Sequence, residues 1–301
     1  MPVHVVGNVC IDTTFWVDRF PRPGETLNAR SHSDGVGGKG ANQAVAVART
    51  GADIRFFAAL GTDTGAAFIK ERLKGEFDLG GLSEKPLPSD RSTIVVSQDG
   101  ENLIVSGVAC VADFDPLQET GLSALIGVGD ILVMQGNLKI AVTDACLRAA
   151  KVVGATTILN PSPLSGETPD LAAVDIVIVN QGEAFEITGD ADPERAVRDI
   201  LRRGAKAAIV TLGAEGCLLL EGDTVDVIPA AKVTVVDTSG AGDVFCGCLA
   251  GCLMKGWTLA QSARMAAAAA ALAVGRAGTL EACPSRAELL KLMNTMEAES
   301  L

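Results

Sequence analysis

Short apolar segments that alternate with helical stretches constrain the fold of this chain most strongly. The apolar segments in its second half are residues 131–134, 156–159, 176–179 and 207–211. Stretches with helical periodicity, at residues 141–153 and 193–203, separate several of them. Strands that alternate with helices are joined by right-handed crossovers, so this pattern predicts a parallel sheet covered by helices on both faces.

The first half continues the pattern but interrupts it with a second kind of sheet. Residues 3–6 and 54–60 read as core strands, and residues 65–73 as a helix. Strand-like pieces at Thr13–Val17 and Thr26–Ser31 stand where a crossover helix belongs, with a turn at Pro21, Pro23 and Gly24 between them. A hairpin of residues 91–97 and 102–106 turns at Asp99–Gly100. We expect residues of about 13–36 and 91–108 to form a small lid sheet inserted in one α/β domain of residues 1–301, because no linker divides the chain.

Polar residues follow most of the predicted core strands. They are Gly7 to Asp12, Gln135–Gly–Asn137, Asn160–Pro–Ser–Pro163, Asn180–Gln–Gly–Glu183 and Thr211 to Gly216. Ligands of open α/β sheets bind at the carboxyl ends of the strands. The repeated polarity therefore predicts a long cleft along that edge, with Asp12 as one candidate contact.

The stretch from Val233 to Phe245 carries the clearest chemical pattern. Its β-branched residues as far as Val236 suit a buried strand, Gly240 and Gly242 suit a turn, and a helix is expected to open at Asp243. Backbone N–H groups at the positive end of a helix form an anion site. A carboxylate beside that site could take a proton from a hydroxyl that attacks phosphorus, although an aspartate and two glycines could equally form a simple helix cap.

A second glycine-rich helix start lies at residues 35–44. Its glycines would let the backbone approach a small polar ligand, and Asn42 offers both a donor and an acceptor. The segment is neither a dinucleotide fingerprint nor a Walker A loop. Lys39 fits either a substrate contact or a solvated lysine at a helix start.

Composition excludes several other functions. The net charge of −12 argues against a nucleic-acid partner, but local N–H groups can still bind the phosphates of ATP. Eight cysteines without a Cys-x-x-Cys pair suggest reduced thiols and a cytoplasmic location. We expect no signal peptide and no membrane span, since the apolar run at residues 265–274 is too short. The chain has two histidines, His4 and His32, which we interpret as structural.

Two long signatures resemble the ribokinase, or PfkB, family of carbohydrate kinases. Residues 37–44 (GGKGANQA) resemble the first signature and residues 236–245 (VDTSGAGDVF) the second. Asn160–Pro–Ser–Pro163, Asn180–Gln–Gly–Glu183 and Thr211–Leu–Gly213 resemble the stations between them, so the match runs from about Val3 to Gly278. The resemblance implies a three-layer α/β core with a mainly parallel sheet, a small β lid, and a homodimer formed through that lid.

The resemblance also implies a role for individual residues. Asp243 matches the catalytic base, and the N–H groups of Gly240, Ala241 and Gly242 match the anion hole. Asn180 and Glu183 match positions that organise Mg²⁺ and the phosphates of ATP, largely through water, and Thr211, Gly213, Gly216 and Gly242 match nucleotide contacts. Asp12, Gly38, Lys39 and Asn42 match sugar contacts, as does the position of Asn137. Relatives activated by K⁺ bind it mostly through backbone carbonyls, here near Asp237 and Ser239 and again near Ala273, Arg276 and Gly278.

Three departures from ribokinases concern the sugar. Cys10 replaces an asparagine, Asn137 replaces a glutamate, and Gly107–Val–Ala–Cys110 replaces a Gly-Ala-Asn segment. Lost hydrogen bonds to sugar hydroxyls change substrate preference. We therefore expect an ATP-dependent kinase acting on a primary hydroxyl, with ribose as first guess and fructose, a 2-keto-3-deoxy sugar acid or a nucleoside as alternatives. A Rossmann oxidoreductase would need a glycine fingerprint after the first strand, which is missing, and a non-catalytic sugar or nucleotide sensor would not need Asp243.

Overall fold

The central element of the computed structural model, which describes residues 1–164 and 166–299, is a sheet of nine strands. Its strands are β1 (Val3–Val6), β4 (Ile54–Leu60), β5 (Leu82–Glu84), β8 (Ile131–Gln135), β9 (Thr156–Asn160), β10 (Ile176–Asn180), β11 (Ala207–Thr211), β12 (Cys217–Glu221) and β13 (Thr224–Ile228). They lie in the order β13-β12-β11-β10-β9-β8-β1-β4-β5. The seven strands from β11 to β5 are parallel, and β12 and β13 are added antiparallel at one edge.

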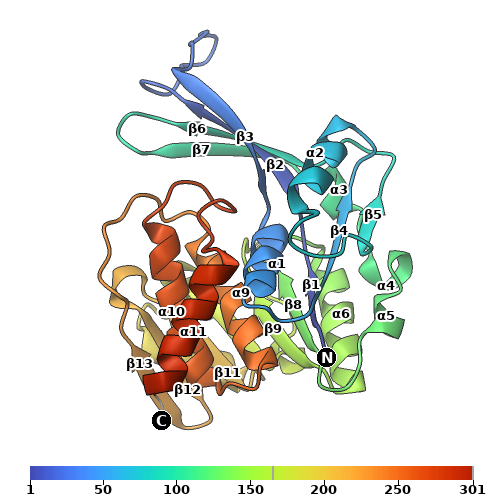
Figure 1. The fold of residues 1–301 in the computed structure, drawn as a ribbon, viewed down its shortest axis with the longest axis vertical. Coiled ribbons are helices and arrows are strands. Elements are labelled where there is room, and N and C mark those ends of the chain that lie inside the picture. Colours follow the sequence, from blue (N-terminus) through green and yellow to red (C-terminus); the bar gives the residue numbers. More distant parts are fainter. Residues whose placement is uncertain (165, 300–301) are drawn as a thin grey trace.

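Successive residues of the core strands point into two separate hydrophobic cores. Val5 and Val133 belong to one core, whereas Val6, Leu132 and Met134 belong to the other. The first core is closed by α1 (Lys39–Arg49), α2 (Thr64–Leu73), α9 (Ala241–Met254), α10 (Leu259–Val274) and α11 (Arg286–Glu299). The second is closed by α3 (Ala109–Ala112), α5 (Leu122–Leu125), α6 (Ile140–Val153), α7 (Gln181–Thr188) and α8 (Pro193–Arg202), and α4 (Pro116–Glu119) lies beside α5. The predicted three-layer α/β fold is thereby confirmed (Figure 1).

Close contact between α1 and α9 brings the two predicted signatures together. A Cβ on Gly247 would lie 2.4 Å from the carbonyl oxygen of Gln43, and one on Gly251 would lie 2.3 Å from Oγ1 of Thr50. Only glycine lets the helix backbones approach this closely. The start of α1 is thus held beside the start of α9, where Asp243 lies.

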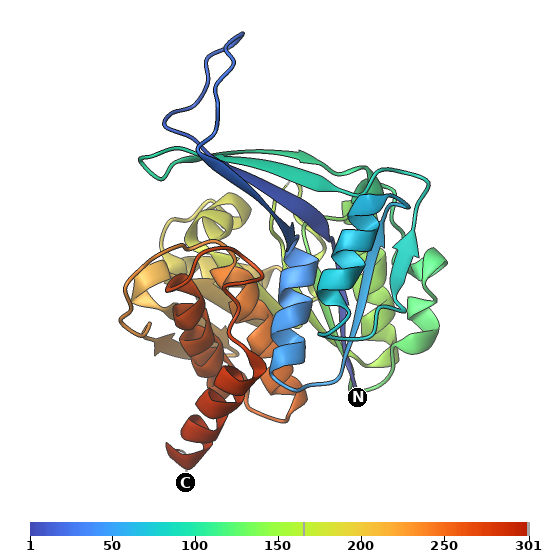
Figure 2. The same ribbon diagram turned by 45° about the horizontal axis from the view of Figure 1, so that its top comes forward.

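The lid is a four-stranded sheet that projects from the carboxyl edge of the main sheet (Figures 1 and 2). Its strands are β2 (Cys10–Trp16), β3 (Ser31–Gly37), β6 (Arg91–Val96) and β7 (Asn102–Gly107), in the order β3-β2-β6-β7. Strand β2 follows β1 after only three residues, so the lid is joined directly to the core. Asp12 therefore lies within a lid strand rather than in the predicted polar turn.

One predicted strand of the lid, Thr26–Ser31, was wrong in its position. Residues 26–30 form no strand, and pairing with β2 begins at Ser31. The observed strand β3 is rich in serine and glycine, which are poor strand formers, and so its sequence gave little sign of it. Residues 17–30 instead form the dark-blue loop that projects furthest in Figure 2.

The predicted strand at residues 233–236 was also wrong. Val235 and Val236 are each 60% exposed, and the N–H of Val236 donates to the carbonyl of Val274 without joining a ladder. The edge of the sheet is formed instead by the hairpin of β12 and β13, which we did not predict. Helix α9 begins at Ala241, two residues before the expected Asp243. Within the described part of the chain, no helix combines the length and the apolar character needed to cross a membrane.

Candidate active site

Asp243 lies in the first turn of α9 and is 5% exposed. Gly240 precedes the helix with a φ of 75°, a left-handed conformation that favours glycine. The first N–H groups of a helix have no intrahelical acceptor. Gly242 is exposed, and a Cβ at this position would meet no atom within 4 Å. The helix start is therefore open to a ligand beside a buried carboxylate.

Two side-chain amides from α1 hold the Asp243 carboxylate. Asn42 Nδ2 donates to Oδ2 across 3.0 Å, and Gln43 Nε2 donates to Oδ1 across 3.0 Å. The Lys39 ammonium lies 4.0 Å from Oδ1, and its side chain is 35% exposed. A partly solvated lysine near a buried carboxylate provides positive charge at the mouth of the site.

Glycines let the start of α1 rest against the connection between β1 and β2. Gly38 has a φ of 98°, and a Cβ there would lie 2.9 Å from the carbonyl oxygen of Asn8. The N–H of Gly40 donates to Asn8 Oδ1. This contact places Gly38, Lys39 and Asn42 next to the root of β2, which carries Asp12.

The Asp12 carboxylate lies over the backbone of β3. A Cβ on Gly37 would lie 1.9 Å from Asp12 Oδ2, so only glycine leaves room for this carboxylate. Cys10 Sγ donates to Asp12 Oδ1 across 3.3 Å. Burial raises the pKa of both Cys10 and Asp12, and the raised pKa of Cys10 keeps it a thiol that can donate.

Two of the buried acceptors that lack a partner among the described residues belong to predicted site residues. They are Oδ1 of Asn42 and Oδ1 of Asn137, which follows β8. A buried polar atom without a hydrogen bond is unfavourable by about 1–3 kcal/mol. Both atoms therefore suit hydroxyl donors of a bound ligand.

A second group of predicted residues lies at the ends of β10 and β11. Asn180 and Glu183 form a reciprocal capping box at α7: Glu183 N–H donates to Asn180 Oδ1, and Asn180 N–H donates to Glu183 Oε2. Thr211 pairs with Asn180 in the ladder and donates from Oγ1 to the carbonyl of Val179. The sheet thus places these three residues side by side, with the second oxygen of Glu183 outside the cap.

The loop after β11 is closed on itself. Leu212 N–H donates to the carbonyl of Gly216, and Gly216 N–H donates to that of Gly213. Gly213 and Gly216 have φ values of 58° and 102°, and a Cβ on Gly216 would lie 2.0 Å from the carbonyl oxygen of Ile228. The exposed Gly213 can therefore offer bare backbone to a ligand, whereas the buried Gly216 lets the loop pack against the residues after β13.

Asp237 joins the two segments predicted to bind a monovalent cation. Its carboxylate accepts hydrogen bonds from the N–H groups of Ser239 and Gly278. Ala273 is buried at the end of α10, where its carbonyl accepts from Arg276 N–H. The Arg276 guanidinium pairs with Glu288, so its side chain points away from Asp237 toward α11. The hydrogen bonds of Asp237 thus bring the two segments together, and the Arg276 side chain is engaged by Glu288.

Comparison with known proteins shows which family this chain belongs to. The model of the pfkB family of carbohydrate kinases matches residues 2–286. The chain belongs to this family. A ribokinase from Haemophilus influenzae is 30% identical over 303 residues, which cover 96% of this chain and 97% of that protein.

Solved structures agree with the family assignment. A ribokinase from Thermotoga maritima superposes with a TM-score of 0.88 at 30% identity, covering 97% of this chain and 99% of the other. An Arabidopsis thaliana ribokinase complexed with ribose and ATP gives a TM-score of 0.89 at 28% identity, covering 97% and 98%. The predicted resemblance is confirmed, and this pfkB-family chain is a carbohydrate kinase, a phosphotransferase with a sugar hydroxyl as acceptor.

Three residues with buried side-chain amides were not predicted to be part of the site. Gln43, Gln135 and Asn160 are at most 8% exposed and form hydrogen bonds to one another. The first signature and the strand ends contained all three residues. Their positions could have indicated this network, because a side-chain amide at a position suited to a core residue needs a buried hydrogen-bond partner.

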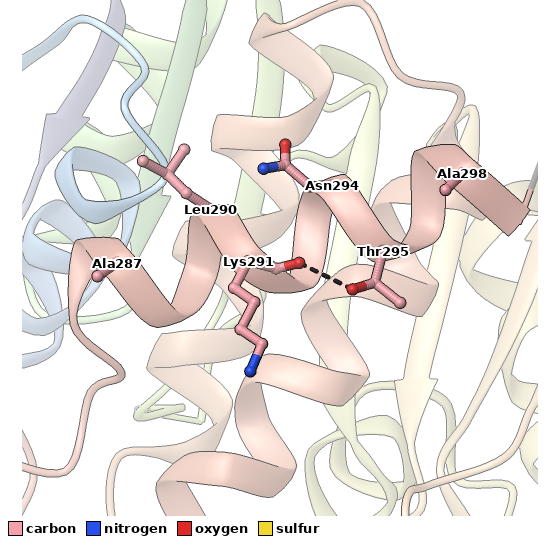
Figure 3. Close-up of a pocket in the computed structure, with 6 residues that line it drawn as sticks. All are labelled: Ala287, Leu290, Lys291, Asn294, Thr295 and Ala298. Carbon is pink, nitrogen blue, oxygen red and sulfur yellow. Dashed lines mark hydrogen bonds between the residues drawn. The ribbon is translucent and has the colours of Figure 1, made fainter.

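A hollow on the outer side of α11 is not part of this site. Its lining residues are Ala287, Leu290, Lys291, Asn294, Thr295 and Ala298 (Figure 3). All belong to one helix, and Thr295 Oγ1 donates to the Lys291 carbonyl of the same helix. None of the predicted site residues lines this hollow.

Proposed function

We propose that this chain transfers the γ-phosphoryl group of ATP to a primary hydroxyl of a small sugar, with Asp243 as general base. The observation that carries the proposal is the position of Asp243, a buried carboxylate in the first turn of α9 next to Gly240, Ala241 and Gly242. Phosphoryl transfer needs an aligned hydroxyl and donors for the phosphate charge. The open helix start provides N–H donors at the place where the transferred group would pass.

The sugar would lie between the lid and the start of α1. Asp12 and the unpartnered oxygens of Asn42 and Asn137 would accept hydrogen bonds from its hydroxyl groups, and Gly38, which packs against Asn8, would hold the start of α1 beside it. Lys39 would face both the sugar and the attacking oxygen. In this arrangement the acceptor hydroxyl donates to Asp243 and loses its proton as the new O–P bond forms.

ATP would lie along the ends of β10 and β11. Asn180 and Thr211 lie on adjacent strand ends, and the loop that follows has an exposed Gly213 and a buried Gly216. No cluster of three or more His, Cys, Asp or Glu side chains suited to hold a metal ion occurs within residues 1–164 and 166–299. A magnesium ion would therefore be held mainly by the phosphates and water, with the free oxygen of Glu183 binding one of those waters. The ion would neutralise charge on the phosphates.

We also propose K⁺ as an activating ion near Asp237. The Asp237 carboxylate fixes Ser239 N–H and Gly278 N–H, so the residues after it and those near Gly278 share one place next to the anion site. A Cβ on Gly240 would lie 3.1 Å from Cα of Thr279, so this second segment also packs on the helix start. Backbone carbonyls of Asp237, Ser239, Ala273, Arg276 and Gly278 would provide the oxygen ligands.

Ribose is the preferred candidate substrate because curated ribokinases and solved ribokinase structures are among the relatives. Deoxyribokinases are also similar, at 29% identity. Cys10 and Asn137 lie where ribokinases carry stronger sugar contacts, so fructose, a 2-keto-3-deoxy sugar acid and a nucleoside stay alternatives. A non-catalytic sensor is disfavoured by the intact setting of Asp243.

We further propose a cytoplasmic homodimer in which residues 1–301 form one kinase domain. Leu103, Ile104 and Val105 on β7 are 49%, 54% and 65% exposed. Leu103 and Val105 lie on one face of the lid sheet and Ile104 on the other, so this edge strand offers exposed apolar side chains on both faces that a second copy could cover. Eight buried free cysteines fit a reducing compartment.

The test is ATP-dependent ADP release across ribose, 2-deoxyribose, fructose, a 2-keto-3-deoxy sugar acid and nucleosides, with and without K⁺. Asp243→Asn serves as the control, and general-base loss should lower kcat by about 10² to 10⁴-fold. Turnover of one sugar, lost in the variant while ATP binding is retained, supports the proposal. Equal turnover by wild type and variant would remove Asp243 from its assigned role, and no turnover of any substrate would favour the sensor.

A further inference from the structure

A chain of buried amides connects the Asp243 carboxylate to the centre of the main sheet. Gln43 Nε2 donates to Asp243 Oδ1 across 3.0 Å, and Gln135 Nε2 donates to Gln43 Oε1 across 2.8 Å. Gln43 Nε2 also donates to Asn160 Oδ1 across 3.2 Å, and Asn160 Nδ2 donates to the Ile178 carbonyl. Gln43 and Gln135 are fully buried. No sugar or nucleotide contact was predicted for either glutamine.

The partners of Gln43 fix the orientation of its amide. Its carbonyl oxygen accepts from Gln135, so its NH₂ group must face Asp243 and Asn160. A rotation of the amide by 180° would place oxygen against the Asp243 carboxylate and against Asn160 Oδ1. That arrangement brings acceptors together, which is strongly unfavourable in a buried setting.

Packing leaves Gln43 and Gln135 little freedom to move. A Cβ on Gly7 would lie 1.9 Å from Gln135 Oε1, so the end of β1 is shaped around this side chain. On the other side, the backbone carbonyl of Gln43 is pressed against Gly247 of α9, the helix that carries Asp243. Donor and acceptor are thus set on two helices locked in contact.

We propose that Gln43 is a positioning residue that holds the Asp243 carboxylate toward the acceptor hydroxyl, and that Gln135 supports the direction of its amide by donating to its oxygen. The inference rests on the proposed kinase function and goes beyond it, because it assigns a role to two fully buried side chains outside the proposed substrate contacts. Asn42 holds the other carboxylate oxygen. With one amide donor on each oxygen, the carboxylate cannot rotate, and a remaining lone pair stays aimed into the site.

A positioning residue should change the rate of the chemical step and not the affinity for substrates. Gln43→Met keeps the length of the side chain and removes the donor. We expect kcat to fall by about 10- to 100-fold, the range that a hydrogen bond to a charged group represents. KM for the sugar and for ATP should stay within about twofold, because neither is contacted.

Gln135 allows a sharper test because it donates to Gln43, and it is Gln43 that donates to the Asp243 carboxylate. Gln135→Glu introduces a group that, when ionised, only accepts. Gln43 would then have to turn its NH₂ toward Glu and its oxygen toward Asp243, so kcat should fall by at least about tenfold. Gln135→Met removes the constraint without reversing it and should have a smaller effect. Gln118→Met, at an exposed position of α4, is the matched control and should leave kcat unchanged and stability nearly so.

The experiment combines steady-state kinetics, thermal unfolding and NMR of side-chain amides in the full-length protein. The Gln43 NH₂ resonances are assigned by their loss in Gln43→Met. These resonances should shift in Asp243→Asn and in Gln135→Glu. If Gln43 had only a structural role, Gln135→Glu would not lower kcat selectively. Selective loss of kcat in folded variants supports the inference.

Two outcomes separate this inference from the proposed function. If wild type phosphorylates a sugar and both Gln43→Met and Gln135→Glu retain its kcat, the positioning role is overturned and the kinase function stands. If no sugar is turned over but the Gln43 resonances respond to Asp243→Asn, the proposed function fails and the amide contact is supported. Absence of any such response would overturn the contact itself.

Discussion

Asn42 Nδ2 donates a hydrogen bond to Asp243 Oδ2 across 3.0 Å, although 201 residues separate the two side chains. The same amide keeps its oxygen buried and without a partner among the described residues. Asn42 can therefore hold the proposed base with one end and accept a substrate hydroxyl with the other. This double use distinguishes Asn42 from Gln43, because both the nitrogen and the oxygen of the Gln43 amide have protein partners.

Asn42→Leu should impair both binding and chemistry. Loss of the donor to Asp243 should lower kcat, and loss of the acceptor should raise KM for the sugar. Two such hydrogen bonds together should lower kcat/KM by about 10² to 10⁴-fold. Steady-state kinetics would check this, with Asn294→Leu on the exposed face of α11 (Figure 3) as the matched control. A change in kcat alone would contradict the proposed contact between Asn42 and substrate.

Gly216→Ala should weaken ATP binding more than Gly213→Ala. A Cβ at Gly216 would clash with the Ile228 carbonyl, so the loop has to move, whereas a Cβ at Gly213 meets open space. Strain of about 1–3 kcal/mol at Gly216 should raise KM for ATP by about 5- to 100-fold. At Gly213 the only cost to an alanine is its left-handed φ, about 1–2 kcal/mol, whereas Gly216→Ala combines an unfavourable φ with the clash, so its effect on KM should be the larger. KM for the sugar serves as the internal control, and equal effects of the two variants would contradict this assignment of the nucleotide loop.

The fold could be predicted from the sequence wherever a pattern depended on neighbours along the chain. Residues 131–134 and 176–179 are apolar runs of strand length that alternate with helical stretches, and they became β8 and β10. Residues 233–236 show the same β-branched composition but are exposed. Their state depends on which strand takes the edge of the sheet, and β13 takes it. Which segment takes the edge is decided by its pairing with β12, and a local sequence pattern carries no information on pairing.

The candidate site divides in the same way. Its parts were found because each follows a predicted strand or begins a helix, such as Asn180 and Asp243. Their contacts were not, because the approach of α1 to α9 depends on Gly247 and Gly251 meeting Gln43 and Thr50. A glycine within a buried helix gives no sign of what it faces. The amide network around Gln43 was therefore visible only in three dimensions.

Val105→Lys should disrupt the proposed lid dimer. Val105 on β7 is 65% exposed, and a symmetric interface would bury it in both copies. Loss of two buried valines at about 1.5–3 kcal/mol each should weaken association by at least 10²-fold, and like charges would add to this. Sedimentation velocity would measure the change. Val227→Lys on β13, with a comparable exposure of 68%, is the matched control. A wild type that stays monomeric, or a Val105→Lys variant that stays dimeric, would contradict the prediction.

Asp175 should make stability depend on pH in the acid range. It is 8% exposed at the amino end of β10, opposite the site, and accepts hydrogen bonds from Thr157 N–H and from the ammonium groups of Lys151 and Lys206. Burial alone would raise the pKa of Asp175, but the hydrogen bonds of Lys151 and Lys206 outweigh it and lower the pKa to about 2. A carboxyl whose pKa is lower in the folded state than in the unfolded state stabilises the fold above about pH 4 and loses this effect as pH falls toward 2.

Asp175→Asn keeps an acceptor for Thr157 but removes the charge. The free energy of unfolding at pH 7 should therefore fall by about 2 kcal/mol, and the difference from wild type should narrow as pH drops from about 4 to 3. Urea unfolding at several pH values would measure this, with Asp223→Asn in the exposed turn between β12 and β13 as control. Sugar turnover at 25 °C should stay unchanged, because the ion pairs lie at the edge of the sheet away from Asp243. A difference between the two proteins that stayed constant from pH 7 to pH 3 would show that the charge of Asp175 does not contribute to stability.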